Sequence, residues 1–294
     1  MPDRISSLYA PSAGITVIGT VVTDLVRAIR DRHDLSPVAT AAVGRLVAGA
    51  VLFGAGLKGR ERLSIQIASD GPIEGLFADA WLLDENTVGA RGYARNPHVD
   101  LPLNARGKFD VAAALGSGSL QVTKTYEVGK PYMGIVALHS GEIAEDLAAY
   151  LVRSEQIPSA VALGVLANPA GVIAAGGILA QVLPGADERA VLELERRAQS
   201  LPPVTQLMSD GADADDLVRA LAGDLELHEH RRLAVTFACL CSRDKVEAAL
   251  VGLGAEDLRQ MARENDTTHA SCEYCKHDYT FAAEELVALS QRVS

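Results

Sequence analysis

The sequence has 294 residues, of which 48% are hydrophobic and only 4% aromatic, and its formal net charge is −11. A chain of this length exceeds one ordinary core, so we expect two or three compact units. The composition is typical of a soluble globular protein. The acidic balance, without a basic patch, argues against nucleic-acid binding, because contacts to phosphate require local positive charge.

The amino terminus has no cationic region followed by an apolar stretch, so we expect no signal peptide and a cytoplasmic location. The apolar segment 38–57 is about as long as a transmembrane span. It contains Arg45 and four glycines, and Ser36-Pro37 ahead of it is typical of a helix start. We therefore predict a buried, alanine-rich helix and no membrane partner.

Residues 1–180 predict an α+β arrangement, namely an α/β core domain with a sheet and packed helices. The clearest strand is 62–68, where residues 63, 65 and 67 are apolar and alternate with polar ones. A turn at 70–72 leads to a second strand at 73–83, so we expect a hairpin. The other predicted strands are 14–22, 88–94, 120–128 and 132–138, the predicted helices are 24–32, 38–57 and 141–156, and apolar runs lie at 160–166 and 172–183.

Residues 181–230 differ in character, with eleven acidic side chains and four arginines, a net charge of −7. Helices are predicted at 187–199 and 213–225, with a short helix between them, and each has only a narrow apolar stripe. Isolated helices of this length are marginal in water and depend on what they pack against. Two interpretations stay open, an ordinary helical linker domain and a conditionally folded segment.

All four cysteines lie in the last sixty residues, as a C-x-C pair (Cys239, Cys241) and a C-x-x-C pair (Cys272, Cys275). Four thiols in two tight pairs match the tetrahedral ligand set of a structural zinc ion, and they equally match two short-range disulfides. Free cysteines can also be small buried hydrophobes, but two isolated pairs favour four-sulfur zinc coordination. The surrounding predictions are a strand-like run at 233–240, helices at 243–250 and 255–265, a polar loop before Cys272, a strand-like run at 278–281 and a helix at 282–292.

The two states of these sulfurs differ in what they connect. Zinc held by all four thiolates joins the two pairs across thirty residues, and such binding contributes roughly 10–16 kcal/mol in metal-folded peptides. Disulfides within each pair close loops of a few residues, worth about 2 kcal/mol each, and do not join the two pairs. Oxidation should therefore unfold so small a module. His228, His230, His269 and His277 lie nearby and are weaker candidates as substitute ligands.

At these residues the sequence resembles the 33 kDa chaperonin family, the redox-regulated heat-shock holdases. The resemblance rests on C-x-C-S at 239–242, on VEAALVGLG at 246–254 and on C-E-Y-C followed by Tyr-Thr-Phe. It extends to segments 56–59, 63–80 and 134–145, and so covers essentially the whole chain. Tyr274 departs from the phenylalanine that is more usual between the paired cysteines.

The resemblance implies three domains: an α/β core domain (1–180), a metastable helical linker domain (181–230) and a zinc-binding redox-switch domain (231–294). It implies a reduced, zinc-bound form that is inactive. Oxidants would form the disulfides Cys239–Cys241 and Cys272–Cys275, release the one zinc ion per chain, and unfold the linker and zinc domains. The active protein, commonly a homodimer, would then hold unfolding client proteins without ATP.

Two alternatives belong to other functional classes. A zinc-dependent enzyme is disfavoured, because catalytic zinc keeps an open coordination position and four thiolates close it. A zinc-ribbon nucleic-acid-binding protein is disfavoured by the acidic charge. The Gly-Lys pairs at 107–108 and 129–130 lack the glycine that a phosphate-binding loop places five residues earlier. We thus expect a chaperone without catalytic residues, whose client-binding surface the sequence does not identify.

Overall fold

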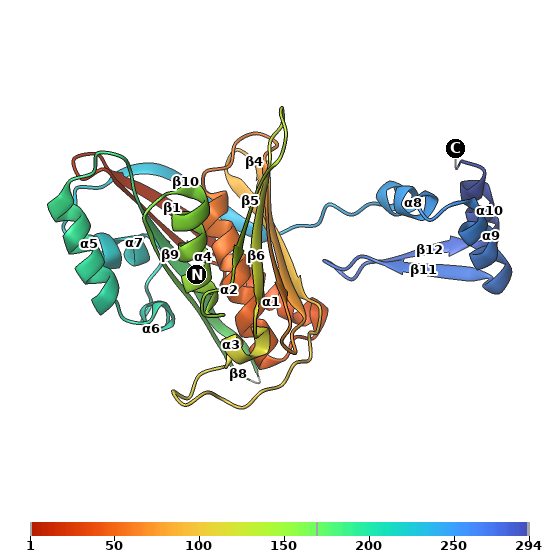
Figure 1. Cartoon of the computed structure of the whole chain (residues 1–294), viewed down its shortest axis with the longest axis horizontal. Helices are drawn as coiled ribbons and strands as arrows, with labels where there is room; N and C mark the ends of the chain where they lie inside the picture. Colours follow the sequence, from red (N-terminus) through yellow and green to blue (C-terminus); the bar gives the residue numbers. More distant parts are fainter. Residues whose placement is uncertain (1, 169, 293–294) are drawn as a thin grey trace. The chain divides into compact units, whose positions relative to one another are not determined.

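The computed structural model describes residues 2–168 and 170–292, and the chain forms two compact units that meet between Ala238 and Cys239 (Figure 1). The first unit contains a large sheet with helices packed on it, and the second is a small unit with all four cysteines. This arrangement confirms the predicted α+β fold class.

The first unit is built on a ten-stranded sheet with the order β7-β6-β3-β4-β5-β10-β1-β2-β9-β8. Neighbouring strands are antiparallel except β10 and β5, which are parallel. The predicted hairpin at 62–83 is confirmed as β3 and β4. The strands are β1 (Arg4–Ala10), β2 (Ile15–Val21), β3 (Arg62–Ser69), β4 (Gly75–Asp84), β5 (Thr87–Ala94), β6 (Gly118–Thr125), β7 (Tyr132–Ala137), β8 (Ser159–Asn168), β9 (Gly171–Val182) and β10 (His228–Phe237).

Helix α2 (Pro37–Gly54) is the central helix of this unit, and it is buried along nearly its whole length. Ser36 begins it, because the Ser36 hydroxyl accepts the Ala39 N–H at 3.2 Å and Pro37 occupies the first turn. Among the described residues it is the one helix long and apolar enough to cross a membrane, and 83% of that stretch is buried in the fold. Its apolar composition is therefore explained by packing against the strands around it.

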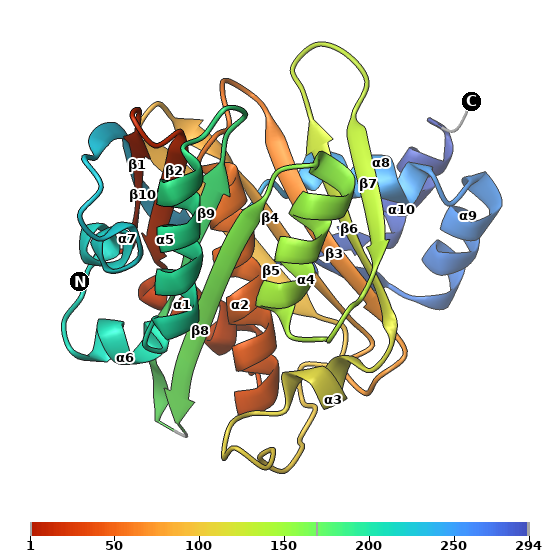
Figure 2. The same cartoon turned by 60° about the vertical axis from the view of Figure 1, so that its left-hand side comes forward.

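Other helices of the first unit lie on both faces of the sheet (Figure 2). Alternate residues of β2 face opposite ways, so Ile18 belongs to the α2 core and Val17 to a second cluster on the other face. Helices α5 to α7 cover that second face. They lie in the charged segment 181–230, where helices were predicted. The bounds are α1 (Thr23–His33), α3 (Val111–Leu115), α4 (Ile143–Tyr150) with a π-helical turn (Leu151–Glu155), α5 (Glu188–Ser200), α6 (Val204–Ser209) and α7 (Ala214–Ala222).

The second unit has a small core of five buried apolar side chains, Leu250, Leu258, Phe281, Leu286 and Leu289. Its elements are α8 (Arg243–Val251), α9 (Ala255–Glu264), β11 (Thr267–Ser271), β12 (Asp278–Ala282) and α10 (Ala283–Ser290). The stretch before Cys272, predicted as a polar loop, is instead strand β11. Pairing with β12 from Thr267↔Ala282 to Ser271↔Asp278 makes it a strand despite its polar composition.

The second compact unit begins at Cys239, and β10 belongs to the large sheet. Residues 188–222 likewise pack on that sheet through α5 to α7. The three domains 1–180, 181–230 and 231–294 stay predictions. A separate, lower stability of segment 181–230 stays a prediction.

Candidate metal centre

Two turns of the second unit carry the four predicted sulfur residues. Cys239 and Cys241 lie on the segment that leads to α8, which begins at Ser242, whose hydroxyl accepts the Lys245 N–H at 3.3 Å. The Lys245 ammonium group donates a hydrogen bond to the carbonyl oxygen of Leu240, between the two cysteines. The short-range pattern C-x-C-S thus combines a ligand pair with a helix start.

Cys272 and Cys275 occupy the tip of the β11–β12 hairpin. The Lys276 N–H donates to the Cys272 carbonyl oxygen at 2.8 Å, and the Cys272 N–H donates to the carbonyl oxygen of His277 at 3.0 Å. Lys276 has a left-handed backbone with φ of 57°, which closes the tight turn after the second thiol. The hairpin register therefore sets the separation of the two sulfurs.

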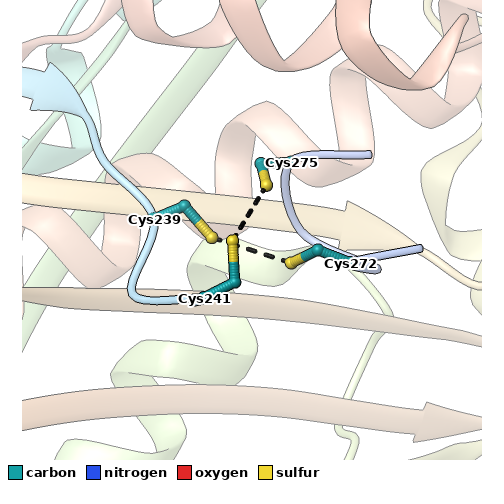
Figure 3. A group of neighbouring side chains, drawn as sticks. All are labelled: Cys239, Cys241, Cys272 and Cys275. Carbon is teal, nitrogen blue, oxygen red and sulfur yellow. Dashed lines mark hydrogen bonds between the residues drawn. The ribbon is translucent and has the colours of Figure 1, made fainter. Parts of the chain in front are cut away.

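The four Sγ atoms converge, and all lie within 4.8 Å of one another (Figure 3). The Cys239 and Cys272 sulfurs are 3.7 Å apart, and the Cys241 and Cys275 sulfurs are 3.4 Å apart. Four thiolates at about 2.3 Å from a tetrahedral metal ion have their sulfurs about 3.8 Å apart. None of these four cysteines forms a disulfide. The cluster has the size and the donor set to hold one metal ion, and soft thiolates favour zinc or iron among common metals.

Without a cation, the clustered thiols favour the protonated, neutral form. Burial raises the pKa of the Cys272 thiol, and burial with hydrogen bonds to neighbouring sulfurs raises that of Cys275 to about 12. The Tyr279 hydroxyl donates to the Cys241 sulfur at 3.2 Å, and this bond raises the pKa of Tyr279 to about 12. A bound cation favours the thiolates instead, so that metal binding releases protons and weakens as pH falls.

The four histidines near the cysteines lie outside the cluster. In the described part of the chain, the group of side chains placed to share a metal ion consists of the four cysteines. His269 lies on β11 opposite Thr280, and His277 stacks edge-on against Tyr279 with ring centroids 4.6 Å apart. His228 and His230 belong to β10. Tyr279 is the site residue that the sequence did not indicate, since nothing in a strand pattern predicts a hydrogen bond to sulfur.

Comparisons with known proteins agree over the whole chain. A family model described as Hsp33 protein matches residues 3–282. A 33 kDa chaperonin from a Cyanothece species is 43% identical, covering 98% of this chain and 97% of the relative. A 33 kDa chaperonin from Ruminiclostridium cellulolyticum is 36% identical, covering 97% of each.

A crystal structure of the 33 kDa chaperonin from Thermotoga maritima superimposes with a TM-score of 0.90 at 34% identity, covering 99% of both chains. The matched relatives are named as chaperonins and not as enzymes, which removes the enzyme alternative. Together with the four-sulfur cluster, these matches establish the resemblance seen in the sequence. The chain belongs to the Hsp33 family of 33 kDa chaperonins.

Proposed function

We propose that the protein is a redox-regulated, ATP-independent holdase that is inactive while reduced and zinc-bound. Zinc is held by Cys239, Cys241, Cys272 and Cys275. Oxidation forms the disulfides Cys239–Cys241 and Cys272–Cys275, releases zinc, unfolds the second unit and segment 181–230, and allows binding of unfolding proteins. The observation that carries the proposal is the convergence of four sulfurs, within 4.8 Å, from two turns thirty residues apart in a unit with five buried core residues.

The small core explains why loss of the metal should unfold this unit. Units of this size rarely stabilise themselves by apolar burial alone, and they depend on metals or disulfides. When bound, zinc supplies a cross-link between the C-x-C turn and the hairpin tip. Disulfides within each pair would stiffen each turn without connecting the two.

The geometry makes the choice of disulfide partner decisive. The Cys239 and Cys272 sulfurs, 3.7 Å apart, and the Cys241 and Cys275 sulfurs, 3.4 Å apart, join one turn to the other and are not neighbours in sequence. Disulfides between Cys239 and Cys272 and between Cys241 and Cys275 would keep the two turns joined. The proposed switch therefore requires disulfides within each pair. Each consumes two thiols, and the two electrons and two protons reduce one peroxide to two waters.

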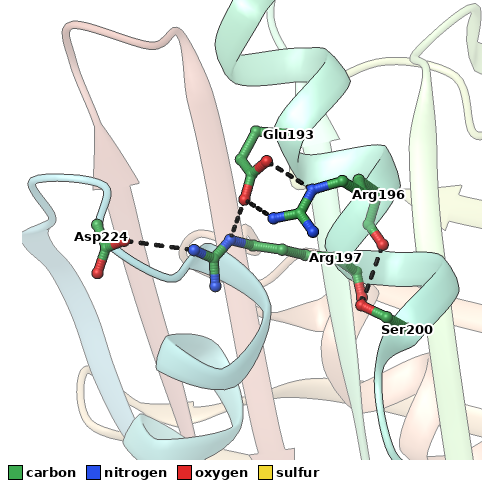
Figure 4. A network of polar contacts seen from close by, with 5 residues as sticks. All are labelled: Glu193, Arg196, Arg197, Ser200 and Asp224. Carbon is green, nitrogen blue, oxygen red and sulfur yellow. Dashed lines mark hydrogen bonds and ion pairs between the residues drawn. The ribbon is translucent and has the colours of Figure 1, made fainter.

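Segment 181–230 has features that would allow its helices to detach from the sheet. Helix α5 fully buries only Leu194, and the segment carries the net charge of −7. On its surface Glu193 pairs with Arg196 and Arg197, and Arg197 also contacts Asp224 (Figure 4). Exposed ion pairs of this kind contribute at most about 1 kcal/mol each. Release of the helices would uncover the apolar side chains on β1, β2, β8 and β9 that they bury.

Direct contacts attach α7 to the sheet. Arg4 of β1 forms an ion pair with Asp213, and the Ser6 hydroxyl donates to Asp215. Arg232 of β10 contacts the same Asp215 at 3.1 Å. Since Arg232 lies seven residues before the first cysteine, β10 provides a covalent path between the metal centre and this attachment.

The experiment uses the zinc-loaded full chain, reduced or treated with peroxide under mild heating. Zinc, free thiols and disulfide pairs are measured on one sample, and light scattering follows aggregation of an unfolding client. We expect release of about one zinc per chain, disulfides within each pair, and suppressed aggregation. A variant with all four cysteines changed to serine is the control that oxidation should not alter. Zinc release with unchanged client aggregation would contradict the holdase proposal.

The proposal includes unfolding clients as partners, a homodimer as the active form and a cytoplasmic location, with neither nucleic acid nor membrane as a partner. Family membership supports the client class. Sedimentation of the reduced and oxidised protein tests the homodimer, which should predominate after oxidation. An unchanged monomer that nevertheless suppresses aggregation would remove the dimer from the proposal.

A further inference from the structure

The first unit contains a cavity of about 600 Å³ beside the C-terminal end of α2. The end of α2 and the turn after it form one side. Strands β1, β2 and β9 form a second side, and the end of β6 with the segment after α4 forms a third. All of the lining residues belong to the first unit, so the cavity is distinct from the metal centre.

A turn held by hydrogen bonds bounds one side of the cavity. The Arg231 guanidinium donates to the carbonyl oxygens of Ala55 at 3.2 Å and Leu57 at 2.7 Å, and so holds the chain that follows α2. Gly56 lies between them, and a Cβ atom added there would meet nothing within 4 Å. A larger side chain at this lining residue therefore has room to extend.

The lining combines an apolar surface with uncharged polar groups. Leu52 and Phe53 of α2 face Ile18 and Leu179 of the sheet. Tyr9 and Gln181 supply a hydroxyl and an amide, and neither side chain makes a hydrogen bond to another described residue. Ser7 and Thr16 add hydroxyls on the same wall.

The carboxylates and the ammonium group of the lining already have partners, and His230 adds an imidazole. The Lys124 ammonium group lies 2.7 Å from Glu155, which also accepts a hydrogen bond from the Tyr150 hydroxyl at 2.9 Å. A Glu61 carboxylate oxygen accepts the Lys58 N–H at 2.9 Å. A charged ligand would have to compete with these contacts, whereas an uncharged donor and acceptor can use Tyr9 and Gln181 directly.

We propose that this cavity binds a small, uncharged amphipathic molecule. Its apolar body packs on Leu52, Phe53 and Leu179, and its amide or hydroxyl head bonds to Tyr9 and Gln181. The volume falls within the range of roughly 300–1,000 Å³ that is typical of small-molecule sites. Because Gln181 lies in segment 181–230, which the proposed switch unfolds, the site belongs to the reduced form. Binding to the reduced form does not require the switch, so failure of the redox proposal leaves this one standing.

The test uses N-phenyl-1-naphthylamine, an uncharged fluorescent probe with an apolar body and one N–H, on the reduced, zinc-loaded full chain. We expect saturable fluorescence enhancement with one site per chain. The Gly56→Met variant, which places a side chain in the open volume, should weaken binding at least tenfold. Glu195→Met, which adds the same side chain at an exposed position of α5, should leave the affinity unchanged.

Two further arms keep the result decisive. The Gln181→Leu variant, which keeps the apolar wall, should weaken the probe several-fold and covers the case in which Gly56→Met fails to fold. 1-Anilinonaphthalene-8-sulfonate, which has the same rings and a negative charge, should bind at least tenfold more weakly. Absence of saturable binding, equal affinity in all three variants, or tighter binding of the sulfonate would each overturn the proposal.

Discussion

Helix α2 in the first unit is buried on nearly every side, whereas helix α9 in the second unit fully buries only Leu258. The first unit has two apolar clusters, one on each face of a ten-stranded sheet, and the second has a single cluster of five residues. Apolar burial scales with such contacts, so the first unit can be stable by packing alone. We expect the stability of the second unit to depend on a metal ion held by its four sulfurs. One chain can thus combine a unit that stays folded by apolar packing with a unit whose folding is expected to require a bound metal ion.

Removal of the metal should have the largest effect and should separate the two units. Chelation under reducing conditions, or Cys275→Ser, should cost on the order of 10 kcal/mol of apparent stability in the second unit. Hydrogen exchange should show loss of protection in β11 and β12, and retained protection in β3 and β4. Ala248→Ser, on the exposed side of α8, is the control that keeps protection. Loss of protection in both sheets would mean that the first unit is not independent.

The response to pH should be opposite in the two units. The Asp3 carboxylate accepts the Asp24 and Leu25 N–H groups at 3.1 and 2.6 Å, yet burial raises its pKa from 3.8 to about 6. The native state then binds this proton more tightly than the unfolded state. Stability from this group is full below pH 4 and is lost as pH rises through 6, by at most about 3 kcal/mol.

Urea unfolding at pH 7.5 and at pH 5, followed by a signal from the first unit, measures this effect. Asp3→Asn removes the charge and keeps one of the two acceptor contacts, because an amide has a single acceptor oxygen. Its stability lacks this titration, so wild type should gain stability relative to the variant as pH falls. Zinc affinity should fall over the same range, because thiolates take up protons. Wild type losing stability relative to Asp3→Asn at pH 5 would contradict the assigned sign.

A larger side chain between β2 and α7 should weaken the packing of α5 to α7 on the sheet without changing the metal centre. A Cβ atom on Gly19 of β2 would lie 2.4 Å from the Ala214 carbonyl oxygen. Gly19→Val should therefore push α7 away at a cost of about 1–3 kcal/mol. In the reduced Gly19→Val variant, trypsin should cut within 187–230 faster than in reduced wild type, and the zinc content of the two proteins should be the same. Gly56→Ala, a glycine substitution into open space, is the matched control; equal cutting of both variants would show that this contact does not hold the helix.

The smallest predicted effect concerns the helix start of α7. One Asp213 carboxylate oxygen accepts the Asp215 and Asp216 N–H groups at 2.9 and 3.1 Å, and the other pairs with Arg4. Asp213→Ala should cost about 1 kcal/mol, the usual value of a cap. Asp224→Ala, at a fully exposed carboxylate, should change stability by less than about 0.5 kcal/mol. Thermal unfolding of the two variants compares them, and equal midpoints would deny Asp213 this role.

The candidate site was predictable because its information is local. Two spacings, C-x-C and C-x-x-C, identify four thiols and imply that each pair can face one ion. The strands were harder where burial removes the alternation of polar and apolar residues. β1 contains Ser6 and Ser7, both buried, and no strand was predicted there.

Other features depend on tertiary pairing. The charged start of β10 was read as the end of a linker, yet His228 pairs with Tyr9 of β1. β11 is a strand only because β12 lies beside it. The cavity beside α2 and the close approach of Gly19 to α7 could not be predicted, since both arise from segments far apart in sequence.

The position of β10 in the sheet has a consequence for the order in which a new chain assembles. β10 lies between β5 and β1, and it alone joins β7-β6-β3-β4-β5 to β1-β2-β9-β8. The ribosome makes it after α5 to α7 and just before the first cysteine. On the nascent chain, these helices are thus available to cover the half-sheet β1-β2-β9-β8 before the joining strand emerges. The growing polypeptide can conceal its apolar face before the unit with the four cysteines has been synthesised.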